Sequence, residues 1–547
     1  MSGVVTTTIL SNGKRMSPEY NLMSIDIIKE VNKIPMAQLI LLDGSASEQE
    51  FAISNTDFFK PGSEIEIKLK YEWEAQNEAT VFKGIIIRHS VRADRYSSYL
   101  SIDLKDAAIK LTRQRRNAVF RDMADSKIIK KIIDSNKTNI EVGDIVNTKV
   151  EHQEMVQFYC TDWDFILSRA DVNGCWIIAD DGQINLVKPK LNKQIKRTFE
   201  YGISDIYELE MDADISHQYT SVESIAWDIK TPEMLPPQQA AEFSLEQSNL
   251  DPGELAKRLS ADSYQLITLA ALEDLEIQAW ADAKLIKSRL SMLQGRLKIP
   301  GVADIKLGDA IDILGIGTKF NGKTLVTAIR HQVNEQGWQT DVQFGLSANW
   351  FTQQNNDIVA PPAAGLIPAI NGLQIGIVDE YREDPDKHFR VRVKIPSIEQ
   401  DGVIWARLAA IDAGKERGIL FRPEVGDEVV LGFINDDPRQ AVILGAMHSE
   451  KNFLPPDFGI GRENNQKGIV TKENLKILFD DEAKSIEIST HNGNKLELSD
   501  TDKGINLIDE NGNTIIMNES GLQIKSSKDI KIEGKNITIK GSKVDIN

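Results

Sequence analysis

One stretch of the sequence fits the pattern of a phosphate-binding loop. Residues 317–324, Gly-Thr-Lys-Phe-Asn-Gly-Lys-Thr, match GxxxxGK[ST], in which backbone amides cradle phosphates and the lysine reaches them. That chemistry needs a strand before the loop and a helix after it. Residues 310–314 are typical of the strand, but residues 325–333 are rich in β-branched residues and predict a second strand. We therefore predict a hairpin turn at Asn321-Gly322 and no nucleotide site.

The residue types that most often bind metals or act as nucleophiles form no recognisable motif. Cys160 and Cys175 have neither metal spacing nor the pattern of a disulfide framework. No two histidines are spaced as HxxxH, HExxH or HxH, and no GxSxG element occurs. We therefore expect no catalytic residue, no metal ion and no cofactor, and we expect that the chain is not an enzyme. The histidines are His89, His152, His217, His331, His388, His448 and His491.

Composition limits the possible partners and compartments. The chain has 547 residues, enough for three or four domains, and a net charge of −18. The acidic excess argues against nucleic acid as a partner, because phosphate binding requires clustered Lys and Arg. The N-terminal residues lack the pattern of a signal peptide, and no window approaches 18 consecutive apolar residues. If the protein leaves the cell, another component must carry it.

The elements that would have to position any site are mainly strands with some helices. In the first 228 residues, the alternation over 64–70 predicts a half-buried strand, and 81–87 is its expected partner. A hairpin is predicted with Asp181-Gly182 at its turn. Residues 297–350 are again predicted to form strands.

Three helices are predicted. Residues 126–133 place four isoleucines on one helical face. A second helix begins near Thr161, which can cap it, and ends at Asn173-Gly174. After a break rich in proline, a long helix is expected over about 263–294, ended by Gly295.

Residues 371–449 predict a compact β unit that follows a linker over 353–370. Five short strands in so short a segment suit a small barrel such as an OB-fold. The unit carries ten Lys and Arg against fourteen Asp and Glu, so we expect a structural collar rather than a binder of single-stranded nucleic acid. The predicted strands are Leu373–Val378, Phe389–Ile395, Val403–Leu408, Glu428–Phe433 and Ala441–Leu444.

Residues 475–547 form an internal β repeat in which apolar residues occur as i, i+2 pairs separated by turn residues. Each short rung holds one strand and one corner, so a single chain cannot wrap a core at this spacing. Three parallel chains, each supplying one face, would give the pairs a shared axis; an antiparallel meander is the alternative. The pairs are Leu475/Ile477, Ile486/Ile488, Leu496/Leu498, Ile505/Leu507, Ile515/Met517, Leu522/Ile524, Ile530/Ile532, Ile537/Ile539 and Val544/Ile546.

Several motifs resemble those of the VgrG spike family of type VI secretion systems and the related spikes of contractile particles and phage tails. Residues 32–37 and 59–62 look like the family's opening strands, and residues 161–170 are similar to its most recognisable helix. In the predicted barrel, residues 389–393 and 421–429 are similar to the family signature, as are Trp405-Ala406-Arg407, Ala413-Gly414, Gly418 and Asp437-Pro438.

This resemblance implies a mainly β architecture in five parts. They are a phage-hub-like domain of two small β-barrels plus helices over 1–352, the linker over 353–370, an OB-fold collar over 371–449, a connector over 450–474 and a trimeric, intertwined β-helix needle over 475–547. It implies a structural spike whose trimeric hub joins the tube and baseplate to a membrane-piercing needle. The alternative is the hub or spike of a phage or phage-like tail acting in a virion.

The resemblance also implies the partners. These are two further copies of the chain, the tail-tube protein, baseplate proteins, a PAAR-type tip protein and effector cargo, while the target membrane is met only by mechanical piercing. Assembly is expected in the bacterial cytoplasm within the baseplate, followed by secretion or delivery by the machine, without a signal peptide.

Two sets of candidate site residues follow from the needle. We expect its distal core to consist of Ile530, Ile532, Ile537, Ile539, Val544 and Ile546. We expect a tip protein to dock by strand addition on Val544, Asp545, Ile546 and Asn547, because exposed strand edges are normally covered. The lysines between 525 and 543 are assigned to a solvated face.

Overall fold

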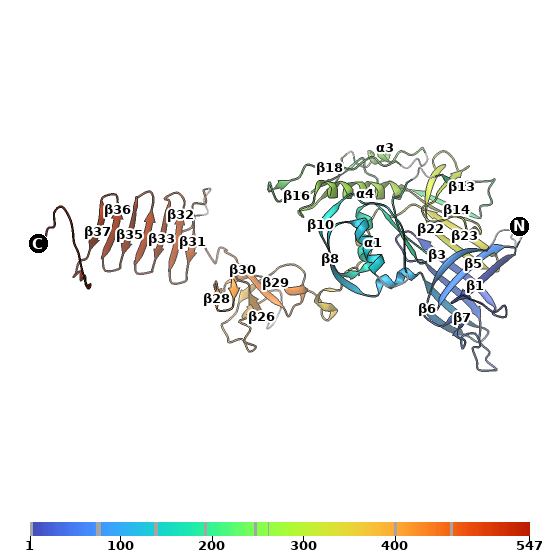
Figure 1. Ribbon diagram of the computed structural model, residues 1–547, viewed down its shortest axis with the longest axis horizontal. Coiled ribbons are helices and arrows are strands. Elements are labelled where there is room, and N and C mark those ends of the chain that lie inside the picture. Colours follow the sequence, from blue (N-terminus) through green and yellow to red (C-terminus); the bar gives the residue numbers. More distant parts are fainter. Residues whose placement is uncertain are drawn as a thin grey trace. The chain divides into compact units, whose positions relative to one another are not determined.

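The structure is a computed structural model that describes residues 4–72, 78–135, 140–190, 194–244, 249–260, 262–398, 402–459 and 463–546. It contains two compact units, Met1–Pro361 and Pro362–Asn547, and each is described by itself (Figure 1). Most of the regular structure is strand, as predicted.

The first unit is built on one large, mostly antiparallel sheet. Its strands enclose one core among β1 and β3–β7 and a second among β13 and β20–β23, and β3 pairs with β22 between them. The strands in which two small barrels were expected form one continuous sheet. In order, its strands are β14 (Glu208–Ala213), β20 (Leu293–Pro300), β23 (Gly337–Phe344), β22 (Gly322–Asn334), β3 (Leu22–Glu30), β4 (Met36–Leu42), β7 (Ser98–Lys105), β6 (Ala79–Ala93), β5 (Glu64–Tyr71), β1 (Val5–Ser11) and β2 (Lys14–Arg15), with β21 (Ala310–Leu314) on β22 and β13 (Ile195–Glu200) on β21.

Alternation along the strands explains which face is buried. In β5, Ile65, Ile67 and Leu69 are buried while the intervening residues are not, as expected for a half-buried strand. The predicted pair 64–70 and 81–87 is confirmed as the antiparallel pair β5–β6.

Smaller sheets complete the first unit. The predicted hairpin is confirmed as β11–β12, and Asp181 and Gly182 at its turn have φ of 53° and 90°, as a type I′ turn requires. The sheets are β8 (Arg115–Ala124) with β10 (Glu151–Thr161); β9 (Glu141–Ile145), β11 (Trp176–Asp180) and β12 (Gln183–Val187); β15 (Val222–Ile225), β18 (Gln238–Gln239) and β19 (Tyr264–Ile267); and β16 (Trp227–Asp228) with β17 (Glu233–Met234).

Two of the predicted helices are confirmed. The first is α1 (Asp125–Ser135), and its four isoleucines are buried. The second is α2 (Asp162–Val172), where the hydroxyl of Thr161 accepts a hydrogen bond from the Asp164 N–H at 3.1 Å. Short helices α3 (Pro252–Ala256) and α5 (Phe351–Gln354) were not predicted.

The long helix predicted over 263–294 is wrong at both ends. The helix α4 runs only from Asp274 to Met292. Tyr264–Ile267 forms β19 instead, because it pairs in parallel with β15. Gly295 does not end the helix. It lies inside β20, which pairs with β14 on one side and with β23 on the other.

A buried ionic cluster holds α1 against α2. The Asp125 carboxylate accepts hydrogen bonds from Arg169 at 2.6 and 2.9 Å, from Asn173 at 2.8 Å and from His152 at 3.1 Å. Burial alone would raise the pKa of Asp125, but the hydrogen bonds from His152, Arg169 and Asn173 outweigh burial and lower it to about 2. The helix contact therefore depends on an ionised carboxylate.

The second unit contains a closed five-stranded barrel, which confirms the predicted OB-type barrel. Alternate side chains such as Val391 and Val393 fill its core. Its strands are β24 (Gln374–Val378), β25 (Val391–Lys394), β26 (Val403–Leu408), β30 (Ala441–Ala446) and β29 (Glu428–Phe433), and a small hairpin joins β27 (Ala413–Gly414) to β28 (Arg417–Gly418).

After the barrel, the chain forms a seven-stranded sheet in which every strand pairs antiparallel with its neighbours in sequence (Figure 1). The antiparallel meander, the alternative in the sequence analysis, is thus what one chain forms here. Its strands are β31 (Gln466–Val470), β32 (Lys476–Asp480), β33 (Ser485–Ser489), β34 (Lys495–Ser499), β35 (Gly504–Ile508), β36 (Thr514–Asn518) and β37 (Gly521–Lys525).

We predict that Asp125→Asn destabilises the first unit by about 3–5 kcal/mol at neutral pH, because Arg169 loses the carboxylate that neutralises it. A group whose pKa is lowered in the folded state stabilises above its ordinary pKa, here 3.8, and loses that effect as the pH falls towards about 2. The difference between wild type and variant should therefore shrink over that interval. Urea unfolding at several pH values measures it; a constant difference would contradict the role of the charge.

Candidate functional site

The seven-stranded sheet carries an uninterrupted apolar face. The pairings place two rows of apolar side chains side by side, one across all seven strands and the other across the six strands β32–β37, because residues i and i+2 lie on one face. One row is Ile469, Ile477, Ile488, Leu496, Leu507, Ile515 and Ile524, and the other is Phe479, Ile486, Leu498, Ile505, Met517 and Leu522. We call these thirteen side chains the apolar face.

The apolar face is left open within one chain. Ten of its side chains are 37–63% exposed, so they lie on solvent rather than in a core. A contiguous apolar surface of this kind is the mark of an interaction site in a soluble protein. The apolar face is therefore suited to binding another apolar surface, and it offers no polar group that would direct a chemical reaction.

The opposite face of the sheet is mostly polar and is held by cross-strand ion pairs. Lys495 lies 3.0 Å from Glu487 on the neighbouring strand and 3.4 Å from Glu497 on its own strand. Burial alone would raise the pKa of Glu487, but hydrogen bonds from Lys495 and Ser489 lower it overall. This face is suited to water, so only the apolar face requires a partner.

The sequence pattern located most of the apolar face but misplaced its first rung. The predicted pair Leu475/Ile477 is Ile477/Phe479 on the strand, and β31 adds Ile469. The run Ile477-Leu478-Phe479 hid the alternation. The nine-residue step back from Ile486/Ile488 would have identified the pair Ile477/Phe479.

Beyond Lys525, the described residues form no strand. The six side chains expected in the needle core are exposed in one chain, from 51% for Ile537 to 89% for Ile546. Val544, Asp545 and Ile546, expected to dock a tip protein, are exposed as well, and Asn547 lies outside the described residues. The structure of one chain gives these residues no partner to pack on, and their two roles stay predictions.

The segment that matches a phosphate-binding loop is a hairpin connection, as predicted. β21 pairs antiparallel with β22, and Ile313 faces Gly322. The turn is wider than Asn321-Gly322, because Gly322 already belongs to β22 and the Asn321 N–H donates to the Gly317 carbonyl at 2.9 Å. No helix follows, and the space beside Lys323 is about 10 Å³, room for one water rather than a phosphate chain.

The cysteines and the most buried histidine lack the properties of reactive groups. Burial raises the pKa of Cys175 to about 11 and raises that of Cys160. Burial lowers the pKa of His331 to about 3, and its Nδ1 lies 3.0 Å from the Thr340 hydroxyl. In the described part of the chain, no three His, Cys, Asp or Glu side chains are grouped to hold a metal ion.

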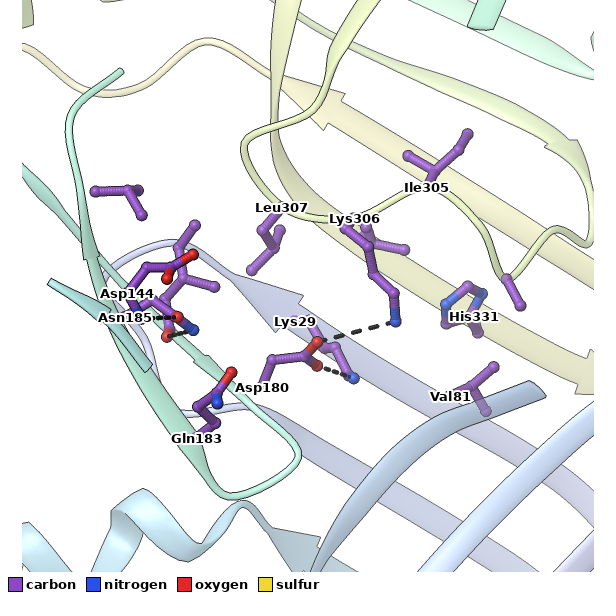
Figure 2. A pocket seen from close by; sticks show the side chains of 14 residues that line it. Lys29, Val81, Asp144, Asp180, Gln183, Asn185, Ile305, Lys306, Leu307 and His331 are labelled. Atoms are coloured by element: carbon purple, nitrogen blue, oxygen red, sulfur yellow. Dashed lines mark hydrogen bonds and ion pairs between the residues drawn. The ribbon is translucent and has the colours of Figure 1, made fainter. Parts of the chain in front are cut away.

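A cavity of about 210 Å³ lies in the first unit where β3, β22 and the β11–β12 hairpin meet (Figure 2). Figure 2 shows Asp180 between the ammonium groups of Lys29 and Lys306. Lys29 forms ion pairs with Asp180 and, at 3.1 Å, with Asp181, and the Asp181 carboxylate also accepts the Lys83 N–H at 2.9 Å. Burial alone would lower the pKa of Lys29, but these two carboxylates raise it overall. The charges around the cavity are thus engaged in fixing the hairpin to β3 and β6.

Three family models match the chain. Residues 1–335 match the Alg8 N-terminal domain, and residues 374–448 match the type VI secretion system/phage-baseplate injector OB domain. Residues 485–547 match the phage baseplate V C-terminal trimerisation domain, which includes most of the apolar face.

Curated relatives match over shorter stretches. The chain is similar to the type VI secretion system spike protein VgrG5 of Pseudomonas aeruginosa, with 27% identity over 158 residues, 25% of this chain and 20% of that protein. It is similar to VgrG3 of Vibrio cholerae, with 28% identity over 181 residues, 29% of this chain and 18% of that protein. The chain thus spans about a fifth of the length of these relatives.

A solved structure described as an E. coli component of the type VI secretion system, similar to T4 bacteriophage tail proteins, matches 80% of this chain and 99% of its own, with a TM-score of 0.38 and 12% identity.

Within the part of the chain that the structure describes, no helix has the length and apolar character needed to cross a membrane.

We predict that the hairpin over 310–334 binds no nucleotide. Titration of the protein with ATP and magnesium in a calorimeter should give no heat of binding, and Lys323→Ala should leave assembly unchanged. Micromolar binding that the substitution abolishes would contradict the hairpin interpretation, since a phosphate site depends on that lysine.

Proposed function

Because this chain belongs to the Alg8 N-terminal domain family and is a VgrG-type spike protein, we propose that it assembles as a homotrimer that forms the hub and needle of a contractile injection machine. The first unit is the hub, which contacts the tail tube and the baseplate. The barrel is the collar, and the C-terminal sheet begins the needle. The role is structural, and the chain performs no catalysis.

The observation that carries this proposal is the open apolar face. A single sheet can be covered on one side by a second layer, but no described residues of the second unit form such a layer over the apolar face of β31–β37. Three such sheets, related by a threefold axis, form a prism in which each apolar face covers the other two. Full burial of one Leu, Ile, Met or Phe contributes about 1.5–3 kcal/mol, so thirteen half-exposed side chains per chain give a large driving force.

The same geometry explains why three copies serve better than two. Two flat sheets would bury their faces against each other but leave four long edges and no continuous shaft. A three-sided prism gives a stiff, narrow needle whose polar faces all point to water. A needle of this kind suits mechanical passage through a target membrane, to which the machine delivers it from the bacterial cytoplasm.

The distal residues continue the needle under this proposal. Ile530, Ile532, Ile537, Ile539, Val544 and Ile546 keep the i, i+2 spacing of the apolar face, and their exposure in one chain is that expected of side chains covered only by other copies. A PAAR-type tip protein then docks on 544–547, and effector cargo travels with the spike.

We predict that Ile505→Asp prevents trimer formation, because it places three charges in the centre of the prism. Asn506→Asp is the matched control: it adds the same charge on the next residue, which faces Glu497 on the polar side. Light scattering should give a trimeric mass for the wild type and for Asn506→Asp, and a smaller mass for Ile505→Asp. A monomeric wild type would contradict the proposal.

The tip contact is tested separately. We expect full-length protein to capture the tip protein encoded beside it, and a chain that ends at Gly541 to lose that capture while remaining trimeric. Equal recovery of the tip protein by both chains would show that residues 544–547 are not its docking site.

A further inference from the structure

The net charge of the C-terminal segment changes sign along its length. Residues 463–520 contain six lysines and twelve acidic residues, a net charge of −6. Residues 521–547 contain six lysines and three acidic residues, a net charge of +3 in a chain whose total is −18. We call 521–547 the basic end. In a trimer its charge is tripled to +9, at the distal side of an acidic shaft.

The lysines of the two parts differ in their partners. In the shaft, Lys476 lies 2.8 Å from Asp457, Lys495 3.0 Å from Glu487 and Lys503 3.5 Å from Glu519. Of the basic-end lysines, Lys531 and Lys543 pair with Glu533 and Asp545, each two residues away in sequence. Among the described residues, no carboxylate lies within 4 Å of the remaining four, Lys525, Lys528, Lys535 and Lys540.

The lysines of the basic end also lie where a trimer would leave them in solvent. Lys531 stands between Ile530 and Ile532, so it points away from the axis on which they would pack. Lys528, Lys535 and Lys540 fall in the breaks between the apolar pairs, where the chain turns a corner. All of them are exposed. A solvated face explains why these lysines are exposed, but it does not explain why the net charge changes from negative to positive along the segment.

We propose that the basic end binds an anionic lipid surface, so that the needle is attracted to the headgroups of a membrane as its distal end passes through. This inference rests on the proposed trimeric spike. Each lysine near a negatively charged bilayer favours binding by about fivefold. A net charge of +9 at one end of the trimer therefore gives substantial attraction.

The range of screened electrostatics favours a flat surface over an extended polymer. At physiological ionic strength, charges interact over about 8 Å, whereas adjacent strands of the shaft are about 4.8 Å apart. A needle that enters a membrane with its distal end first brings the basic end within this range of the headgroups, while most of the acidic shaft still lies beyond it. A nucleic acid duplex lying along the needle would meet both parts, and the −6 of each shaft segment would repel it.

The test is vesicle flotation with the full-length protein. We expect binding to vesicles that mix phosphatidylglycerol with phosphatidylcholine, none to phosphatidylcholine alone, and loss of binding at about 0.3 M salt. The variant Lys528→Gln/Lys535→Gln/Lys540→Gln should bind more weakly by on the order of tenfold or more. The control Lys472→Gln/Lys484→Gln/Lys503→Gln removes the same charge from the shaft and should bind as well as wild type.

Light scattering on each protein separates this inference from the proposed function. A monomeric wild type contradicts the trimeric spike. A trimer that ignores the anionic vesicles, or that loses binding equally in both triple variants, overturns the basic end as a lipid-binding surface. Salt-sensitive binding of duplex DNA, without vesicle binding and lost only in the basic-end variant, would also overturn it, because the partner would then be an anionic polymer.

Discussion

Two rows of apolar side chains on one face of β31–β37 lie open to water within the described part of the second unit. The hydrophobic effect favours covering them, and the described strands and turns of the meander provide no second layer that could do so. Neighbouring strands align the rows because the register is antiparallel and regular, so Ile488 faces Leu496 and Leu496 faces Leu507. Self-association is thus built into the fold of one chain, and the barrel and hub need only be compatible with threefold symmetry.

The first unit is organised by a different interaction. Buried ionic contacts join elements that are distant in sequence: Asp125 joins α1 to α2, and Lys29 joins β3 to the turn of the β11–β12 hairpin. Such pairs add little net stability compared with apolar packing, but a change in position leaves a charge buried without its partner. They therefore specify one arrangement of the hub, and the perturbed pKa values of Asp125 and Lys29 reflect that structural role rather than catalysis.

The charged side chains of the needle can vary without disturbing the trimer contact, because successive residues of a strand point to opposite faces of the sheet. The residues between those of the apolar face point to water, so lysines and carboxylates there can be exchanged at little cost to packing. The shaft uses this freedom for cross-strand ion pairs such as Lys495 with Glu487, and in the basic end Lys531 takes such a position between Ile530 and Ile532. One strand pattern can therefore encode both the trimer contact and, at its distal end, a surface with a different preference.

The sequence by itself determined the local elements. Alternation located β5 and β6, the cap at Thr161 located α2, Asp181-Gly182 located a turn, and the spacing of Ile486/Ile488 and its successors defined the apolar face. These signals depend on residues close in sequence. The β-branched run after Lys323 likewise sufficed to separate a hairpin from a phosphate-binding loop.

Only the tertiary structure decided those strands and ion pairs whose partners lie far away in the sequence. Tyr264–Ile267 is a strand because β15 lies beside it, and Gly295 lies in β20 because β14 and β23 pair with it on either side. Lys29 gave no signal in the sequence, since its partners follow it by about 150 residues. Whether the C-terminal strands pair within one chain or between chains was also open. Both arrangements bury the same i, i+2 pattern, and only the partner and direction of each strand distinguish them.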